Sequence, residues 1–179
     1  MYTQFFAGYL LEEKYLSKKQ IIEGLKSMKK SRAELGVLAM NAGYLTAAQV
    51  ERIHERQSVE DKRMGDIAVE MGYMTQAQVD ELLEEQPSRY LMFAQTLVDK
   101  EFMDNSAFML ALNNFKVSYG ITDSDMISTD DETLRRIVKQ YYRIEDMPQA
   151  DDIADYIILL FNNMVRFVGD DYVPLPLDT

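Results

Sequence analysis

The chain has 179 residues, 47% of them hydrophobic, and a formal net charge of −11 at pH 7. This length allows one or two small domains with a buried core, and the negative charge disfavours binding to nucleic-acid polymers and anionic lipid. There is no cysteine and a single histidine, which excludes a disulfide framework and a thiolate nucleophile and nearly excludes a His-based zinc site or a Ser-His triad.

No targeting or membrane segment stands out. The first residues lack the basic region and apolar core of a signal peptide. The longest strongly apolar run, Tyr156 to Phe161, is too short to span a bilayer. We therefore expect a cytoplasmic protein without membrane insertion, without a cofactor and without enzymatic activity.

One pattern recurs along the chain at a fixed spacing of 29 residues. Its clearest copies are 34–57 and 63–86, and weaker copies lie before and after them. Equivalent positions carry an aromatic residue, then an apolar residue, then a polar residue: Tyr15, Tyr44, Tyr73, Phe102; Leu16, Leu45, Met74, Met103; Ser17, Thr46, Thr75, Asp104. A fixed period of this length indicates stacked supersecondary units. It predicts a helical repeat domain of four units over 1–116.

Each unit is expected to be a helix-turn-helix. Ser17, Thr46, Thr75 and Asp104 are good N-cap residues, and in the first three units a glutamine follows three positions later, which predicts a capping box. Gly43 and Gly72 stand where the first helix must end, and glycine permits a left-handed residue there. The fold class is therefore predicted as all-α, with tandem helix-turn-helix repeats of 29 residues. The aromatic positions are candidates for the core.

The outer units depart from this pattern. In the first unit, over 1–30, Lys14 replaces the glycine, and the charged run Lys26–Arg32 is expected to be a solvated linker. Pro87 follows the third unit and predicts a helix stop. The fourth unit, 88–116, lacks both the glycine and the glutamine. End units of a repeat array are commonly atypical.

The spacing ends after Lys116, and we expect 117–179 to be a helical C-terminal segment with an extended tail. Its acidic stretch from Asp123 to Glu132 has two interpretations. A calcium loop lacks a turn glycine and a closing glutamate at the required positions. The favoured interpretation is helix caps and first-turn acids, with Thr129 or Asp130 opening a helix that runs through Tyr142.

A long apolar helix is predicted from about Asp151 to Val168, ending at Gly169. Its apolar residues cover more than one stripe, which predicts burial on most sides. The tail 172–177 is expected to be extended because of its prolines. A face left uncovered on this helix is expected to meet a further domain of a longer protein or a second copy, as a homodimer.

The two clear units resemble the N-terminal domains of type II secretion and pilus ATPases, of the MshEN or GspE N-terminal type. Members of that family that bind cyclic di-GMP carry two 24-residue motifs separated by five residues, each with an initial Arg-Leu-Gly, a central glycine and a final glutamine. Residues 34–57 and 63–86 have this length and separation. The resemblance implies nucleotide-binding residues at Arg32, Leu35, Gly36, Gly43, Gln57, Arg63, Met64, Gly65, Gly72 and Gln86.

The chemistry of these residues is compatible with that ligand. Gly36 and Gly65 allow backbone amides to approach a phosphate at a helix start, and Arg63 offers a planar guanidinium to phosphate or guanine. The segment from Lys26 to Arg63 holds eight basic and five acidic residues, within an acidic protein. Two positions depart from the family: Glu34 replaces arginine and His54 replaces leucine.

Two functions follow. The first is a non-catalytic bacterial signalling module that binds a protein partner and has cyclic di-GMP as its ligand. The second is a purely structural adaptor or dimerisation domain without a ligand, attached to a chemotaxis or secretion protein. A weaker resemblance of 161–171 to the region before CheX-like chemotaxis domains points to the same setting, without a phosphatase motif.

Overall fold

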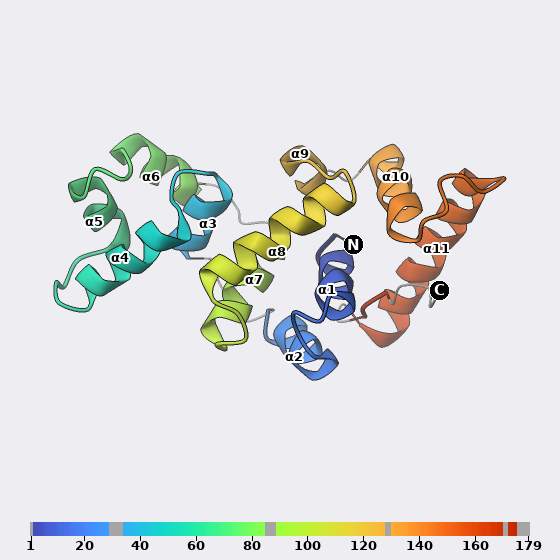
Figure 1. Cartoon of the computed structure of the whole chain (residues 1–179), viewed down its shortest axis with the longest axis horizontal. Coiled ribbons are helices and arrows are strands. Elements are labelled where there is room, and N and C mark those ends of the chain that lie inside the picture. Colours follow the sequence, from blue (N-terminus) through green and yellow to red (C-terminus); the bar gives the residue numbers. More distant parts are fainter. Residues whose placement is uncertain (1, 29–33, 85–88, 128–129, 170–171, 175–179) are drawn as a thin grey trace. The chain divides into compact units, whose positions relative to one another are not determined.

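The structure is a computed structural model, and it describes residues 2–28, 34–84, 89–127, 130–169 and 172–174. These residues form α-helices and no strands, so the predicted all-α class is confirmed. The helices, in order, are α1 (Tyr2–Glu12), α2 (Lys18–Met28), α3 (Leu35–Asn41), α4 (Ala47–Gln57), α5 (Met64–Glu70), α6 (Gln76–Glu84), α7 (Arg89–Asp99), α8 (Asn105–Ser118), α9 (Asp123–Ile127), α10 (Asp131–Tyr141) and α11 (Ala150–Val168) (Figure 1).

The chain divides into two compact units. One is residues 27–110, and the other joins residues 1–26 to residues 111–179. The second unit therefore combines the two ends of the chain. The boundary expected from the sequence, after residue 116, marks where the 29-residue spacing ends and stays a prediction.

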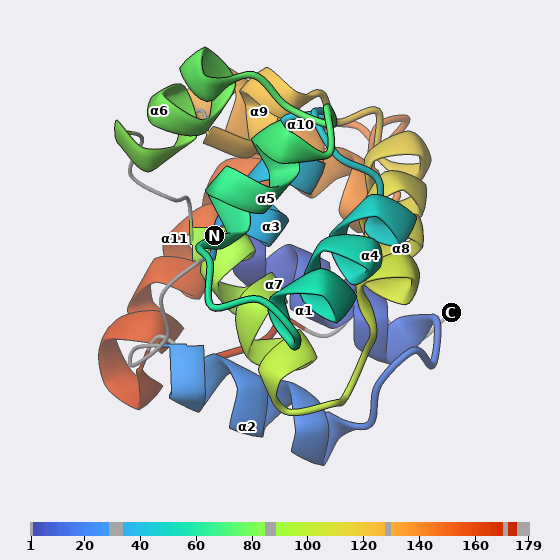
Figure 2. The ribbon, with the colours of Figure 1, turned by 90° about the vertical axis from the view of Figure 1, so that its left-hand side faces the viewer.

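The unit of residues 27–110 is organised around α3, which contacts α5, α6 and α7, while α4 contacts α5. Figure 2 shows α3 and α5 next to each other. The interior is mainly aliphatic between α3 and α6, with aromatic residues in α7 and α8. Fully buried large side chains of this unit are Ile53, Ile67, Phe93, Leu97 and Phe108.

The unit of residues 1–26 and 111–179 has an aromatic core. The ring of Phe5 contacts the rings of Tyr141, Tyr142 and Phe161, and Phe6 contacts Phe115. Helix α1 is buried along nearly its whole length, and α10 packs against α11 (Figure 1). A glycine in α1 makes this packing possible: a side chain at Gly8 would overlap the Tyr141 hydroxyl and lie 2.7 Å from the Pro174 carbonyl oxygen.

The N-caps form as the sequence predicts. Thr46 and Gln49 make a complete capping box, with Gln49 N–H donating to Thr46 Oγ1 at 3.2 Å and Thr46 N–H donating to Gln49 Oε1 at 2.8 Å. Ser17 with Gln20 and Thr75 with Gln78 make the same pair of bonds. Asp104 accepts from the backbone N–H of Ala107 at 2.7 Å. These bonds fix where the second helix of each pair begins.

The first helix of each pair ends in a left-handed residue. The φ angles at Lys14, Gly43, Gly72 and Glu101 are 60°, 76°, 69° and 57°. At each one, the next residue donates its N–H to a carbonyl five positions earlier, as in Tyr44 to Ala39 and Tyr73 to Ala68, both 2.9 Å. This is the Schellman arrangement, which satisfies the last carbonyls of the helix. Two of the four positions adopt it without glycine.

The aromatic positions do not form the core as expected. Tyr15, Tyr44, Tyr73 and Phe102 are half-buried, and three of them place a hydroxyl in a polar contact, as Tyr44 does with Glu81 at 2.9 Å. The residues that follow them, Leu16, Leu45, Met74 and Met103, are buried. The phenol keeps its polar end at the surface because burying it would require a hydrogen-bond partner there.

The last helix has the expected bounds, since it runs from Ala150 to Val168 and Gly169 caps it. The prediction that it is a long apolar helix buried on most sides is wrong. Its first turn carries Asp151 and Asp152, and within the helix only Ala154 and Phe161 are buried. Its apolar residues form one wide arc, and part of that arc, including Tyr156, Leu160 and Phe167, is exposed to solvent.

Three smaller predictions can be compared with the structure. The charged run was expected to be linker, but Lys26 and Met28 belong to α2 and 29–33 lie outside the described residues. Asp130 caps α10 by accepting from Thr133 N–H at 2.8 Å, which confirms its predicted role. Residues 172–174 have neither helix nor strand, and 175–177 lie outside the described residues.

Candidate functional site

The structure brings together the starts of the two motifs. Residues Leu35 and Gly36 open α3, and Met64 and Gly65 open α5. A Cβ atom at Gly36 would lie 3.0 Å from Met64 Cε and 3.2 Å from Val50 Cγ1. A Cβ atom at Gly65 would lie 3.3 Å from Leu35 Cδ2 and 2.9 Å from Val79 Cγ1. Each glycine thus receives an apolar side chain from the other motif.

This packing gives both glycines a structural role. Gly36 and Gly65 are buried, while Leu35 and Met64 are half-buried. The missing side chains allow α3 and α5 to approach each other and the helix that follows each of them. On the sides where a Cβ atom would stand, neighbouring side chains already fill the space.

The cavity beside Gly36 is small. It has a volume of about 20 Å³ and is lined by Glu34, Gly36, Val37, Val50, His54, Gln95, Val98 and Asn105. Nucleotide-sized ligands occupy pockets of about 300–1,000 Å³, so this cavity has room for about one water molecule. The Gln95 amide in its wall is bonded within the protein, since it accepts from Glu34 N–H at 3.3 Å and donates to Asp99 at 2.8 Å.

The other motif residues lie in different settings. Gly43 and Gly72 form the left-handed turns, with no atom within 4 Å of a Cβ placed there. Gln57 is half-buried and donates to the carbonyl oxygen of Lys62 at 3.1 Å. Arg63 is the exposed N-cap of α5, and its side chain has no bond to the described part of the chain. Arg32 and Gln86 lie outside the described residues.

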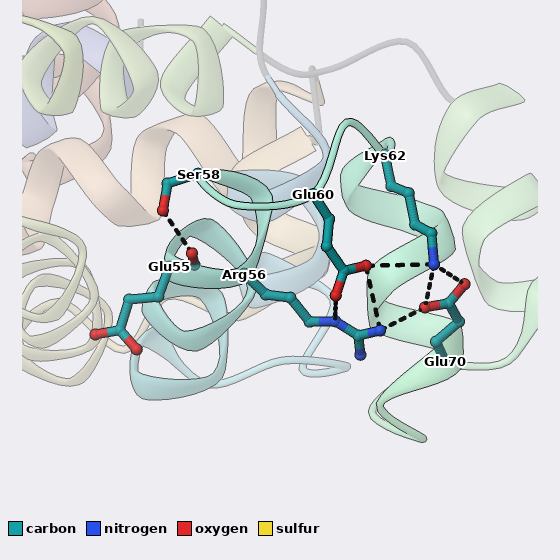
Figure 3. A network of polar contacts seen from close by, with 6 residues as sticks. All are labelled: Glu55, Arg56, Ser58, Glu60, Lys62 and Glu70. Carbon is teal, nitrogen blue, oxygen red and sulfur yellow. Dashed lines mark hydrogen bonds and ion pairs between the residues drawn. The ribbon is translucent and has the colours of Figure 1, made fainter.

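Arg56, near the end of the first motif, and Lys62, between the two motifs, are neutralised by carboxylates (Figure 3). Arg56 contacts Glu60 and Glu70, both at 2.7 Å, and Lys62 contacts Glu70 at 2.8 Å and Glu60 at 3.3 Å. The hydrogen bond from Arg56 holds the pKa of Glu60 below its usual range. Arg56 and Lys62, two of the eight basic residues of this segment, therefore join α4, the following loop and α5.

The two positions that depart from the family pattern lie at this site. Glu34 precedes α3 as its N-cap residue, but its side chain makes no cap hydrogen bond. His54 lies on α4 and is exposed. Both residues line the small cavity beside Gly36.

A mixed-charge pocket of about 540 Å³ lies along α10 and α11. Its basic residues each face a carboxylate: Arg135 with Asp155 at 2.5 Å, Arg136 with Asp125 at 2.7 Å and Lys139 with Asp151 at 2.7 Å. Asp125 also accepts from the Thr122 N–H, which caps α9. The acidic stretch thus supplies helix caps and first-turn acids, as in the favoured interpretation of the sequence, and in addition an ion pair.

The last helix presents an exposed apolar surface where the sequence predicted burial on most sides. It is the outer face of α11, formed by Tyr156, Leu159, Leu160, Met164, Phe167 and Val168. Phe167 is 83% exposed and Tyr156 is 61% exposed. The opposite face carries Ala154 and Phe161 into the aromatic core. The apolar residues follow one another around most of the helix, so the sequence alone suggested burial on most sides.

A comparison of the chain with protein-family models, curated proteins and solved structures gave no match. Within the described ranges, no helix has both the length and the apolar character needed to cross a membrane.

Proposed function

We propose that this chain is a non-catalytic protein-interaction module, in which four helix-turn-helix units of 29 residues form a scaffold and the outer face of α11 contacts a protein. The setting we propose is bacterial signalling, attached to a chemotaxis or secretion system. The scaffold part is supported by the same C-cap geometry at Lys14, Gly43, Gly72 and Glu101, and by N-caps at Ser17, Thr46, Thr75 and Asp104.

The observation that carries the interaction proposal is the exposed apolar face of α11. Scattered apolar residues are normal on a protein surface. Six large apolar side chains on adjacent turns of one helix expose an area on the order of several hundred Å², the size at which a patch marks an interaction site. An uncovered patch of this kind promotes association.

Site-specific photocrosslinking tests this proposal. A photoreactive amino acid replaces Phe167 in the full chain, and the same amino acid replaces Val117, which is 83% exposed and lies outside α11. In the cells that express each variant, we expect a high yield of protein adducts from position 167 and a low yield from position 117. Equal yields at the two positions, or no adduct from position 167, would remove the interaction proposal.

Cyclic di-GMP binding is a second candidate function. What favours it is the convergence of Leu35, Gly36, Met64 and Gly65, with the exposed Arg63 next to Met64 and without a bond to the described residues. Against it stand the filled space around both glycines and the carboxylates on Arg56 and Lys62. A ligand there would have to bind at the surface, held mainly by Arg63.

Calorimetric titration of cyclic di-GMP into the full chain tests this candidate. Binding that is lost in Arg63→Ala and retained in Arg52→Ala would establish it, since Arg52 is an exposed arginine of the same region with a Tyr73 contact at 3.5 Å. No heat of binding, or equal binding by both variants, would leave the two motifs with a packing role.

A further inference from the structure

The outer face of α11 has the spacing of a helix-pairing seam. Tyr156, Leu160, Asn163 and Phe167 follow one another at intervals of four, three and four residues, so they lie along one side of the helix. Leu159 and Met164 flank this line on either side. Only one polar residue, Asn163, interrupts it, and a single polar residue in such a seam is a known means of fixing register.

The seam is complementary to itself when two copies of α11 run in opposite directions. A two-fold axis midway between Tyr156 and Phe167 places Tyr156 of one copy beside Phe167 of the other, and Leu160 beside Asn163. By symmetry, the contact between Tyr156 and Phe167 then forms twice. In a parallel arrangement Asn163 would face Asn163, and the acidic first turns would face each other.

The charges on α11 favour the antiparallel direction. Asp151, Asp152 and Asp155 lie near its N-terminal end and Arg166 lies in its last turn. Asp151 and Asp155 already pair with Lys139 and Arg135 of α10. Asp152 and Arg166 are exposed and form no ion pair within the described part of the chain. Antiparallel pairing brings the free acid of each copy toward the free arginine of the other.

We propose that the partner of the outer face of α11 is a second copy of this chain, bound through an antiparallel α11–α11 contact. This inference rests on the proposed interaction function and specifies its partner. The apolar area on each copy is on the order of several hundred Å², within reach of the about 800 Å² per partner in a standard interface. The flanking ion pairs set the direction.

Cysteine crosslinking tests both the partner and the direction. The chain has no cysteine, so an introduced thiol is the sole one in each variant. Purified Tyr156→Cys and Phe167→Cys full chains are mixed under mild oxidation. We expect a disulfide dimer in the mixture and little in Tyr156→Cys alone, because antiparallel pairing separates the two 156 positions by about 16 Å along the helix. Val117→Cys mixed with Phe167→Cys is the control for random collision.

A charge exchange gives an independent measurement of direction. Arg166→Asp and Asp152→Arg are each expected to weaken dimerisation about tenfold, because symmetry affects two exposed ion pairs at once. The double variant is expected to recover most of the wild-type affinity. Circular dichroism of each variant confirms that the helices are intact.

The outcomes separate this inference from the proposed function. Efficient disulfide formation by Tyr156→Cys alone would overturn the antiparallel contact. Crosslinking of the mixture no higher than the Val117→Cys control would overturn self-association altogether. In that case, photocrosslinked adducts from position 167 whose mass differs from twice that of the chain would leave the interaction function standing with another partner. Absence of all adducts would remove both.

Discussion

At the scale of single residues, the four helix ends share one left-handed conformation but differ in what that conformation costs. Gly43 and Gly72 adopt positive φ without cost from a Cβ atom, whereas Lys14 and Glu101 adopt the same conformation with one. A left-handed residue other than glycine costs about 1–2 kcal/mol. The outer pairs of helices therefore keep their turns in spite of their sequence, because the surrounding packing requires the turn.

Reciprocal substitutions at these turns should have opposite effects. Lys14→Gly is expected to raise the free energy of unfolding by about 1 kcal/mol, and Gly43→Ala to lower it by about 1 kcal/mol. The space around the Gly43 Cβ position is empty, so the effect there is purely conformational. Urea denaturation measures both changes. The control is Lys19→Gly inside α2, which should be destabilising; a loss of stability in Lys14→Gly as well would contradict the account.

Buried tyrosines in the aromatic core should make the protein sensitive to alkali. Burial raises the pKa of Tyr119 and of Tyr142 to about 12, and it raises the pKa of Tyr141 further. In the unfolded chain these hydroxyls ionise near pH 10. A raised folded-state pKa means that the stabilising contribution is complete below about pH 10 and is lost as the pH rises from there toward 12.

We therefore expect the free energy of unfolding to be nearly constant from about pH 7 to about pH 9 and to fall steeply above about pH 10. Denaturation by urea across this range measures the slope. Tyr142→Phe should reduce the slope, while Tyr156→Phe, at an exposed position, should leave it unchanged. A slope that is identical in all three proteins would show that these buried hydroxyls do not govern the alkaline limit.

At the scale of elements, the sequence predicted helix ends better than it predicted burial. Caps depend on a few adjacent residues, and Ser17, Thr46, Thr75 and Asp130 all cap as their local sequence indicates. Burial depends on which other elements pack nearby. The half-buried tyrosines and the exposed face of α11 could not be deduced from periodicity, because the pairing of α1 with α10 and α11 joins distant parts of the chain.

The same limit applies to the candidate site. The sequence correctly placed Gly36 and Gly65 at helix starts, and the family resemblance grouped the two motifs. Neither the sequence nor the resemblance could reveal that Met64 and Leu35 fill the space above these glycines, because this packing depends on the contact between α3 and α5. Nor could they show Glu60 and Glu70 neutralising Arg56 and Lys62.

Gly65→Ala tests whether this glycine serves helix packing. The new methyl group would lie 2.9 Å from Val79 Cγ1, so α5 and α6 must shift apart. Overpacking of this kind costs about 1–3 kcal/mol, and the higher helix propensity of alanine offsets part of it. We expect a net loss of about 1 kcal/mol in thermal or urea unfolding. If packing is the reason, Val79→Ala in the same chain should make Gly65→Ala neutral or stabilising; a full loss that persists in the double variant would contradict it.

At the scale of the whole molecule, each compact unit has its own kind of core and its own surface feature. Residues 27–110 have a mainly aliphatic interior around α3 and an ion-pair cluster between α4 and α5. Residues 1–26 with 111–179 have an aromatic interior and the exposed outer face of α11. We propose that the capped helix pairs form the scaffold and that α11 contacts another protein.

The most direct test of this assignment is the mass of the full chain in solution, measured by sedimentation equilibrium over a range of concentrations. One chain has a mass of 20.7 kDa. We expect a reversible dimer, and Phe167→Glu should weaken it about a hundredfold because symmetry removes two aromatic contacts with Tyr156. Val117→Glu should leave the dimer unchanged. A wild-type chain that stays monomeric at the highest concentration, or a dimer unaffected by Phe167→Glu, would contradict the account.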